Sequence, residues 1–217
     1  MEEIKLDIEN PKTIEEGVEK SQEALASGGV VVFPTDTIYG LGANALDEHA
    51  ISKIYKIKNR DINKPISILV RDIAMAKKVA CIDSKVEEIL KKIWPNSVTV
   101  VLRKKDVVPY ILTANEENIA LRISNNFFIK KLFEKNDFPI TATSANISGE
   151  ENLLLASEII KKFADAKFAP DLFINAGNLQ NRLPSTIIDL TDANNPRLVR
   201  MGIVGKDRLS AFFKNFL

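Results

Sequence analysis

The first polar segment that could do chemistry follows an apolar run near the N-terminus. Residues 30–33 are all apolar, and residues 34–41 then bring two threonines, an aspartate, a tyrosine and a glycine close together. In α/β proteins, ligands bind in the crevice beyond the ends of the strands, where apolar strands give way to such polar groups. The segment therefore predicts a ligand site, and a turn closed by the aspartate side chain is the alternative interpretation.

The second segment is a cluster of cations at the expected end of a helix. Lys56, Lys58, Arg60 and Lys64 fall within nine residues. Arginine offers a planar fork that matches phosphate oxygens, and lysine offers a compact point charge, so the cluster suits a polyphosphate. Cations at a helix C-terminus also stabilise the helix macrodipole, and this second interpretation remains open.

A third segment is rich in small hydroxyl side chains. Residues 139–149 pass from an apolar start into a run that ends with Ser144, Asn146 and a glycine. Hydroxyls and backbone N–H groups in such a nest can hold phosphate or carboxylate oxygens. A strand exit with Ser/Thr turn bonds would explain the same residues. Other polar residues near expected strand ends are weak evidence in isolation: Arg122, Ser185 and Arg200.

Composition and charge exclude several classes of protein. The chain has 217 residues, with 30 Lys+Arg against 29 Asp+Glu and a formal net charge of +1. Its overall charge therefore does not steer nucleic acid. One cysteine, Cys81, excludes an internal disulfide framework, and we expect it to be a small buried hydrophobe. One histidine, His49, leaves no His-rich metal site and is expected at the surface, so no metal-ligating residues are predicted.

Several familiar sequence signatures are also missing. The sequence contains no Gly-x-x-x-x-Gly-Lys-Ser/Thr phosphate loop, no Gly-x-Gly-x-x-Gly dinucleotide fingerprint, no Gly-x-Ser-x-Gly elbow and no kinase signature set. The charged N-terminus is not followed by the apolar core of a secretory signal, and no apolar run approaches the ~20 residues of a spanning helix. We therefore expect a cytoplasmic protein.

Helical and strand patterns alternate along the chain, which indicates α/β layering in a single domain over residues 1–217. Capping boxes at 13–16 and 84–87, and an aspartate at position 47, predict three helix starts. Helices are expected at 14–27, after residue 47, near 72–79, and at 84–93, 127–134, 157–167 and 206–216. Strands are expected at 30–34, 65–70, 98–103, 119–124, 140–143, 172–175, 186–190 and 197–200.

Together these segments resemble the YrdC-type threonylcarbamoyl-AMP synthases, from about residue 14 to residue 205. The family pattern Pro-Thr-Asp-Thr-x-Tyr-Gly-Leu stands at 34–41. The paired Lys-x-Arg and Ser-x-Asn elements of the family stand at positions 58/60 and 144/146. Trp-Pro-Asn-Ser-Val-Thr at 94–99 is similar to the family's Trp-Pro-Gly-Pro-Leu-Thr, and 184–187 matches its Pro-Ser-Thr-Ile.

The chain departs from the family pattern at three places. Asn96 and Ser97 replace a Gly-Pro pair, and Ser124 replaces the proline of the family's Val-Arg-x-Pro strand end. Leu69 stands where some members carry a histidine, so the resemblance implies that this contact with the amino acid is missing or supplied differently.

The resemblance implies a twisted mixed α/β sheet flanked by helices around a basic concave cavity. It also implies a reaction in which L-threonine, bicarbonate or CO2, and ATP give L-threonylcarbamoyladenylate and pyrophosphate. This is the first step of the t6A37 modification of tRNA. The implied cofactor is Mg2+ bound through the ATP phosphates. The implied further partner is tRNA or the t6A transferase complex, with no membrane, while the oligomeric state stays open.

Residue roles also follow from the resemblance. The implied threonine-binding residues are Thr35, Tyr39, Arg122, Ala142 and Ser185. The implied ATP-binding residues are Lys58, Arg60, Lys64, Asn118, Ser144, Asn146 and Arg200, and the implied catalytic group is Lys58, Arg60, Ser144 and Asn146. Asp36 is expected either to support these residues without contacting the ligand or to belong to a turn.

Two alternatives to this enzyme remain. A non-enzymatic double-stranded RNA or tRNA-binding module would use the same basic cavity, but the near-neutral net charge disfavours it. The other alternative is a carbamoyl-transfer paralogue of the same fold.

Overall fold

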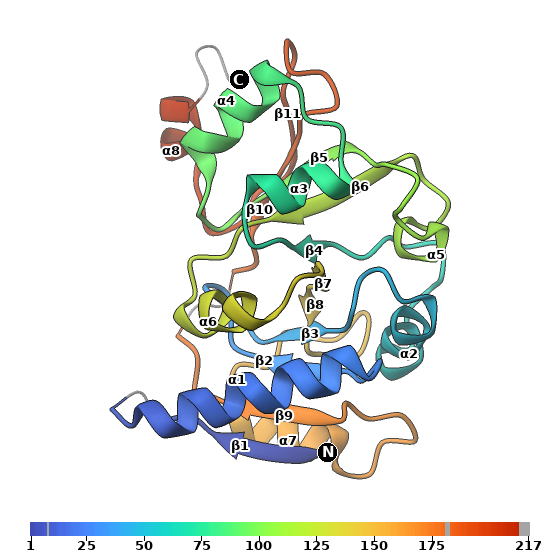
Figure 1. Ribbon diagram of the computed structural model, residues 1–217, viewed down its shortest axis with the longest axis vertical. Helices are drawn as coiled ribbons and strands as arrows, with labels where there is room; N and C mark the ends of the chain where they lie inside the picture. The colour runs from blue at the N-terminus through green and yellow to red at the C-terminus, as the bar shows by residue number, and fades with distance from the viewer. Residues whose placement is uncertain (8, 181–182, 213–217) are drawn as a thin grey trace.

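The computed structural model describes residues 1–7, 9–180 and 183–212, and over these residues the chain forms two mixed sheets, one above the other in Figure 1. The lower sheet has the order β1 (Glu2–Lys5), β9 (Leu172–Asn175), β2 (Val31–Phe33), β3 (Gly40–Gly42) and β8 (Thr143–Ser144). The upper sheet has the order β11 (Arg197–Arg200), β10 (Thr186–Asp189), β5 (Val98–Arg103), β6 (Asn118–Arg122), β4 (Ile68–Leu69) and β7 (Ile140–Thr141). The expected α/β class is confirmed, with two sheets in place of one.

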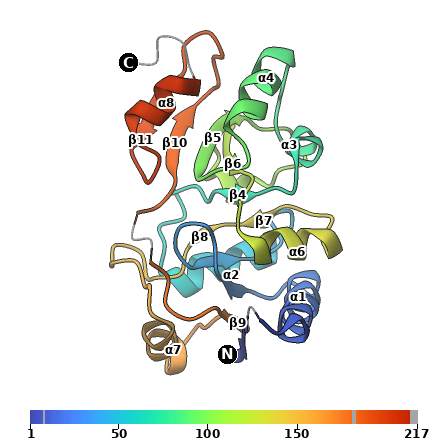
Figure 2. The same ribbon diagram turned by 90° about the vertical axis from the view of Figure 1, so that its left-hand side faces the viewer.

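Helices flank both sheets. They are α1 (Pro11–Ala26), α2 (Glu48–Lys58), α3 (Ile73–Val79), α4 (Ser84–Ile93), α5 (Tyr110–Thr113), α6 (Phe127–Lys135), α7 (Ala156–Ala164) and α8 (Lys206–Phe212). Figure 2 shows α1 and α7 on opposite sides of β9, so the lower sheet is covered on both faces there. Because both faces are covered, all three residues of β2 and the first three residues of β9 are apolar and buried.

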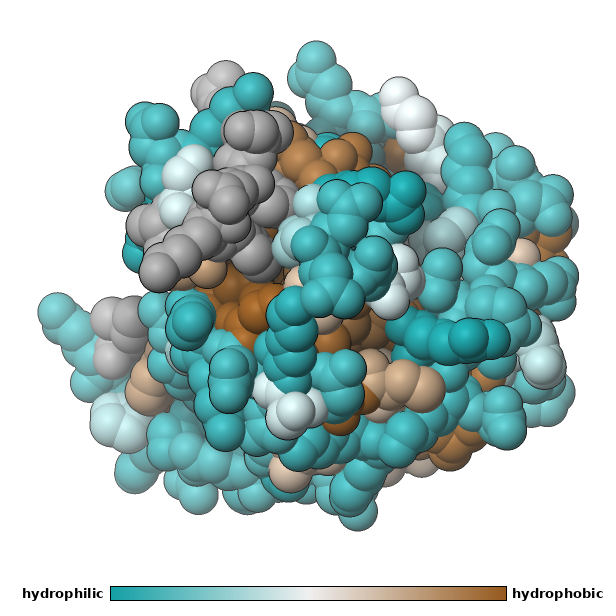
Figure 3. Space-filling view, turned by 90° about the horizontal axis from the view of Figure 1, so that it is seen from above, coloured by the Kyte–Doolittle hydropathy of each residue, from teal (hydrophilic) through white to brown (hydrophobic). Residues whose placement is uncertain are grey.

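The end of the molecule that carries α4 and α8 presents a mostly hydrophilic face (Figure 3). Seen from the end of the molecule that carries α4 and α8, hydrophobic side chains are visible mainly in hollows between hydrophilic ones (Figure 3). Within the described ranges, none of the helices is long and apolar enough to cross a membrane.

One short segment belongs to both sheets and connects them. β7 pairs with β4 in the upper sheet, and β8 pairs with β3 in the lower sheet. Between β7 and β8, the backbone N–H of Ala142 donates to the carbonyl of Ser67 at 2.7 Å, and the Ser67 hydroxyl donates back to the Ala142 carbonyl at 2.8 Å. The strand expected at 140–143 is therefore two strands, and the chain changes sheets within the hydroxyl-rich segment.

Two helix starts differ from the expected capping boxes. α1 is capped by Asn10, whose side chain accepts from the backbone, and the Thr13 hydroxyl instead donates to the carbonyls of Asp7 and Asn10. The helix begins earlier because a proline can take its first position, where its missing N–H is not needed. α4 is capped by Asp83 rather than by the expected box.

Other expectations are corrected by tertiary contacts. The strand expected at 65–70 is reduced to β4, since Pro65 has no N–H and the N–H of Ile66 donates to the carbonyl of Leu112 at 2.9 Å. β1, β3 and α5 were not expected from the sequence. Cys81 is exposed rather than buried, because it lies in the connection between α3 and α4, while His49 is exposed as expected. Residues 213–216 of the last expected helix lie outside the described residues.

Replacing Gly42 by alanine should destabilise the fold by about 1–3 kcal/mol, the usual cost of overpacking a core. The added Cβ would lie 2.1 Å from a ring carbon of Phe33 and 2.8 Å from Ile140, and both of those side chains are fully buried. Gly205→Ala is the matched control, because nothing lies within 4 Å of its added Cβ. Urea titrations will compare the two free energies of unfolding, and equal losses in both variants would contradict the close packing at Gly42.

Candidate functional site

A cavity of about 520 Å³ is lined by residues of both sheets, within the ~300–1,000 Å³ range of small-molecule sites. The site residues expected from the sequence that line it are Thr35, Tyr39, Arg60, Asn118, Arg122, Ala142, Ser144, Ser185 and Arg200. The charged residues of this lining are Arg60, Arg122, Arg200 and Glu116, which makes the cavity basic although the whole chain is nearly neutral.

Lys58 lies behind the wall of the cavity and binds the segment that carries Ser144 and Asn146. Its Nζ donates to the carbonyl oxygens of Ser144 at 2.5 Å and Asn146 at 2.7 Å, and to Oδ1 of Asn146 at 2.9 Å. The Ser144 hydroxyl also donates to Oδ1 of Asn146. The structure therefore brings the cationic segment and the hydroxyl-rich segment together at one wall of the cavity.

Burial has the largest effect on the pKa of Lys58. The side chain of Lys58 is 1% exposed, and desolvation, followed by the nearby Arg60 guanidinium, lowers the pKa of Lys58 to about 7. The amine therefore changes its charge close to neutral pH, where an anion in the cavity would favour the charged form.

The end of α2 separates Lys58 from Arg60. Asp47 caps the start of this helix as expected, accepting from the backbone N–H groups of residues 49 and 50. Lys58 is the last helical residue, and Asn59 then takes a left-handed conformation with φ 47°. This turn sends Lys58 into the interior and Arg60 toward the cavity.

Arg60 is held by the backbone of the loop that follows it. Its Nε donates to the carbonyl of Lys64 at 3.1 Å and its Nη2 to the carbonyl of Pro65 at 2.9 Å. Desolvation lowers the pKa of Arg60, while Tyr55 and Asp61 oppose this effect. The side chain of Lys64 is exposed and is not among the lining residues, so its carbonyl oxygen is what it contributes to this arrangement.

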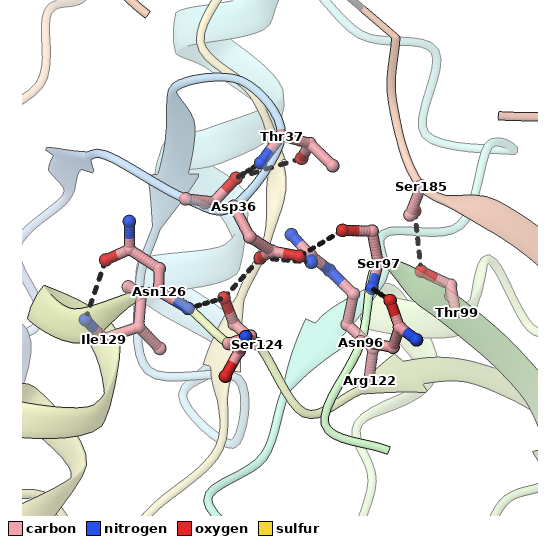
Figure 4. A network of polar contacts seen from close by, with 12 residues as sticks. Asp36, Thr37, Asn96, Ser97, Thr99, Arg122, Ser124, Asn126, Ile129 and Ser185 are labelled. Atoms are coloured by element: carbon pink, nitrogen blue, oxygen red, sulfur yellow. Dashed lines mark hydrogen bonds and ion pairs between the residues drawn. The ribbon is translucent and has the colours of Figure 1, made fainter. Parts of the chain in front are cut away.

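Arg122, at the end of β6, is paired with Asp36 (Figure 4). Nη1 of Arg122 donates to Oδ1 of Asp36 at 2.6 Å, and the two side chains are 7% and 13% exposed. The hydroxyls of Ser124 and Ser97 donate to Oδ1 and Oδ2 of the same carboxylate. Both serines stand where the sequence departs from the motifs of the family that it resembles.

The charge of Asp36 follows from these contacts. Burial acts to raise the pKa of Asp36, but the Arg122 guanidinium and the two serine hydroxyls outweigh it and hold this pKa below its usual value. The carboxylate is therefore ionised at neutral pH, and Asp36 lies directly behind Arg122 rather than in a simple turn.

Thr35 and Tyr39 form the wall of the cavity on the side of the lower sheet. The Thr35 hydroxyl donates to the carbonyl of Ile38 at 2.7 Å and lies 3.0 Å from the hydroxyl of Thr37. The fully buried Tyr39 donates to the carbonyl of Gly177 at 2.7 Å. Burial raises the pKa of Tyr39 to about 12, so its hydroxyl stays protonated.

The opposite wall carries a second group of hydroxyls. The Ser185 hydroxyl lies 2.8 Å from that of Thr99 on β5, and Nη2 of Arg200 donates to the Ser185 carbonyl at 2.9 Å. Asn118, the first residue of β6, lies at the exposed rim of the same cavity.

Some residues of the lining were not expected from the sequence. They are Ser67, Thr99, Thr143, Asn152 and Glu116, among others. Thr99 belongs to the Trp-Pro-x-x-x-Thr segment, which was a usable signal, whereas a lone glutamate in a loop gives none. Leu69 is fully buried in β4 and is not among the lining residues, so it makes no contact in the cavity.

Among the residues that the structure describes, no group of three or more His, Cys, Asp or Glu side chains could hold a metal ion.

Known proteins are similar to this chain over most of its length. The Sua5/YciO/YrdC family model, described as "Telomere recombination", matches residues 23–202. A protein of Methanocaldococcus jannaschii, named provisionally as a threonylcarbamoyl-AMP synthase, is 37% identical over 171 residues, 79% of each chain. A threonylcarbamoyl-AMP synthase of Pyrococcus abyssi is 36% identical over 179 residues, 82% of this chain and 52% of its own length.

Solved structures are similar over almost the whole chain. The crystal structure of P. abyssi Sua5 complexed with L-threonine has a TM-score of 0.86 and 31% identity, covering 98% of this chain and 60% of that one. The crystal structure of E. coli YciO has a TM-score of 0.79 and 28% identity, covering 94% and 96%. This chain thus spans about half to three fifths of the Pyrococcus proteins and nearly all of YciO.

The low pKa of Lys58 predicts how stability depends on pH. Between pH 7 and the ordinary value of 10.5, the unfolded chain keeps a proton on Lys58 that the folded chain has released. The free energy of unfolding should therefore rise with pH in this window, by about 2 kcal/mol between pH 7 and pH 9 from this group. Urea titrations of the wild type and Lys58→Met should show this rise in the wild type only, and parallel pH profiles would contradict it.

Proposed function

The chain belongs to the Sua5/YciO/YrdC family, and on this premise we propose that it is an ATP-dependent L-threonylcarbamoyladenylate synthase, a nucleotidyltransferase. It joins L-threonine, bicarbonate or CO2, and the adenylyl group of ATP, and releases pyrophosphate. The product feeds the t6A37 modification of tRNA through a separate transferase complex, in the cytoplasm. Relatives named as threonylcarbamoyl-AMP synthases support this proposal.

One observation carries the proposal. Lys58, at the end of α2, donates to Ser144 and Asn146 after the change of sheet, and Arg60 and Ser144 line a single cavity. Arg122 lines the same cavity from the upper sheet. Groups suited to phosphates and a group suited to a carboxylate thus share one space, as a reaction between ATP and an amino acid requires.

The amino acid binds at Arg122. A guanidinium has five N–H donors in a planar fork, so it can hold a carboxylate while one N–H group stays on Asp36. The hydroxyls of Thr35 and Ser185, with the backbone at Ala142, line the space beside it. Tyr39 closes the wall of this part of the cavity through its bond to the carbonyl of Gly177.

The ATP phosphates bind at the other arginines. Arg60 and Arg200 both line the cavity, and both are oriented by bonds to backbone carbonyls. Ser144 offers its hydroxyl, and Asn118 lies at the rim for the nucleoside. Lys58 and Asn146 act from behind Ser144, while Lys64 reaches the phosphates only from the exposed loop.

The chemistry needs alignment and charge stabilisation more than a strong base. The threonine amine takes up CO2 as a carbamate, whose oxygen attacks the α-phosphorus of ATP while pyrophosphate leaves. Arg60, Arg200 and the amine of Lys58 stabilise the charge that develops on the phosphates. Mg2+ held by ATP rather than by residues of this chain would neutralise part of the charge of the phosphates.

Incubation with ATP-Mg, bicarbonate and labelled L-threonine should yield a labelled threonylcarbamoyl-adenylate by mass spectrometry, together with pyrophosphate. Omitting any one substrate should abolish the product, because the adenylate contains atoms of all three. Pyrophosphate release with carbamoyl phosphate but not with threonine would favour the carbamoyl-transfer paralogue. Thermal stabilisation by tRNA alone, without stabilisation by threonine plus ATP-Mg, would favour the RNA-binding module.

Arg60→Ala should lower kcat/KM for adenylate formation by about 100-fold, the typical effect of removing one donor to developing charge. Lys56→Ala is the matched control, since Lys56 belongs to the same cationic segment but is exposed and is not among the lining residues. Its rate should remain close to that of the wild type. Equal rates in the two variants would show that the arginine does not act on the phosphates.

A further inference from the structure

Within one cavity, the three arginines have different partners. Arg122 is paired with the ionised carboxylate of Asp36. The guanidinium hydrogen bonds of Arg60 and Arg200 go to neutral carbonyl oxygens, those of Lys64, Pro65 and Ser185. Among the described residues, Arg122 is therefore directly bonded to a carboxylate, whereas the bonds given for Arg60 and Arg200 are to uncharged oxygens.

We propose that Asp36 is a positioning residue that sets both the direction and the net charge of Arg122, so that this end of the cavity selects a zwitterionic amino acid over a simple anion. The inference rests on the proposed function, since it concerns how that enzyme would keep the threonine carboxylate and the ATP phosphates at separate ends.

The geometry fixes the direction of Arg122. Asp36 comes from the loop between β2 and β3, and Arg122 ends β6 of the other sheet. Ser97, before β5, donates to one carboxylate oxygen of Asp36, and Ser124, after β6, donates to the other (Figure 4). The carboxylate is held by three donors from the upper sheet and its loops, so it cannot turn away from the arginine, and the guanidinium presents its remaining N–H groups to the cavity.

The charge of the pair decides what this end can bind. A buried guanidinium without a counter-charge would attract any anion, including the phosphate groups needed at the other end. With Asp36 ionised beside it, the pair is neutral, and a sulfate or phosphate gains little there. A zwitterion adds no net charge when it binds, so its carboxylate can use the directed N–H groups of Arg122 at a lower electrostatic cost.

The test uses Asp36→Asn, which keeps an oxygen acceptor but removes the charge. Binding of L-threonine is measured by calorimetry without ATP, with and without sulfate as a competing anion. Threonine affinity should fall by about tenfold, as expected when a charged hydrogen-bond partner is lost, and sulfate should compete more strongly than it does in the wild type. Either readout remaining at its wild-type value overturns the proposal.

Asp189→Asn is the matched control. Asp189 is also paired with an arginine, Arg197 at 2.8 Å, and also accepts from a hydroxyl, that of Thr191, but Arg197, unlike Arg122, is not among the cavity lining. This variant should leave threonine affinity and sulfate competition unchanged. If the changes in Asp36→Asn came only from a general loss of stability, the same changes in threonine binding and sulfate competition would be expected in Asp189→Asn.

A second variant decides the matter if Asp36→Asn does not fold. Replacing both Ser97 and Ser124 by alanine keeps the ion pair and removes only the two hydroxyl donors, which should weaken threonine binding about threefold. Unchanged affinity overturns the proposal. Because these experiments read binding, they stay separate from the proposed function, whose failure would be the absence of adenylate from the wild type.

Discussion

Lys58 carries an amine into the interior at the end of α2, and a buried polar group of this kind must be hydrogen-bonded. Its acceptors are oxygens of Ser144 and Asn146, just beyond the point where the chain passes from the upper sheet to the lower one. The lysine therefore fixes the backbone where the sheets meet. Since the cavity is lined by both sheets, its shape depends on these bonds.

The two cations of the Lys-x-Arg element occupy different positions, because Lys58 is buried behind the cavity wall and Arg60 lines the cavity. The left-handed conformation of Asn59 separates the two side chains, so that Lys58 lies in the interior and Arg60 lies at the cavity. Lys58 shapes the wall through its bonds to the segment that carries Ser144, whereas Arg60 itself lines the cavity. If the helix continued past Lys58, the side chain of Arg60 would lie on nearly the opposite side of the helix axis, because residues two apart do not share a helix face.

Much of the fold could be predicted from local sequence signals, because helix caps and long apolar strands carry their own information. Asp47 caps α2 as expected, and β5 and β9 have the expected bounds. The shortest strands could not be predicted correctly. β4, β7 and β8 contain two residues each, so they exist only through pairing with distant strands, and no local pattern distinguishes them from loops.

The residues of the candidate site could be predicted where they stand together in short motifs. A side chain whose role depends on residues from several separate segments was harder to predict. Asp36 could be described from the sequence only as a residue behind the site or in a turn. Ser97 and Ser124, in two separate motifs, each replace a proline, and neither change has an evident meaning in the sequence. The structure places both hydroxyls on the carboxylate that holds Arg122. A proline has no hydroxyl to donate, so these two changes act on the same ion pair and have to be interpreted together.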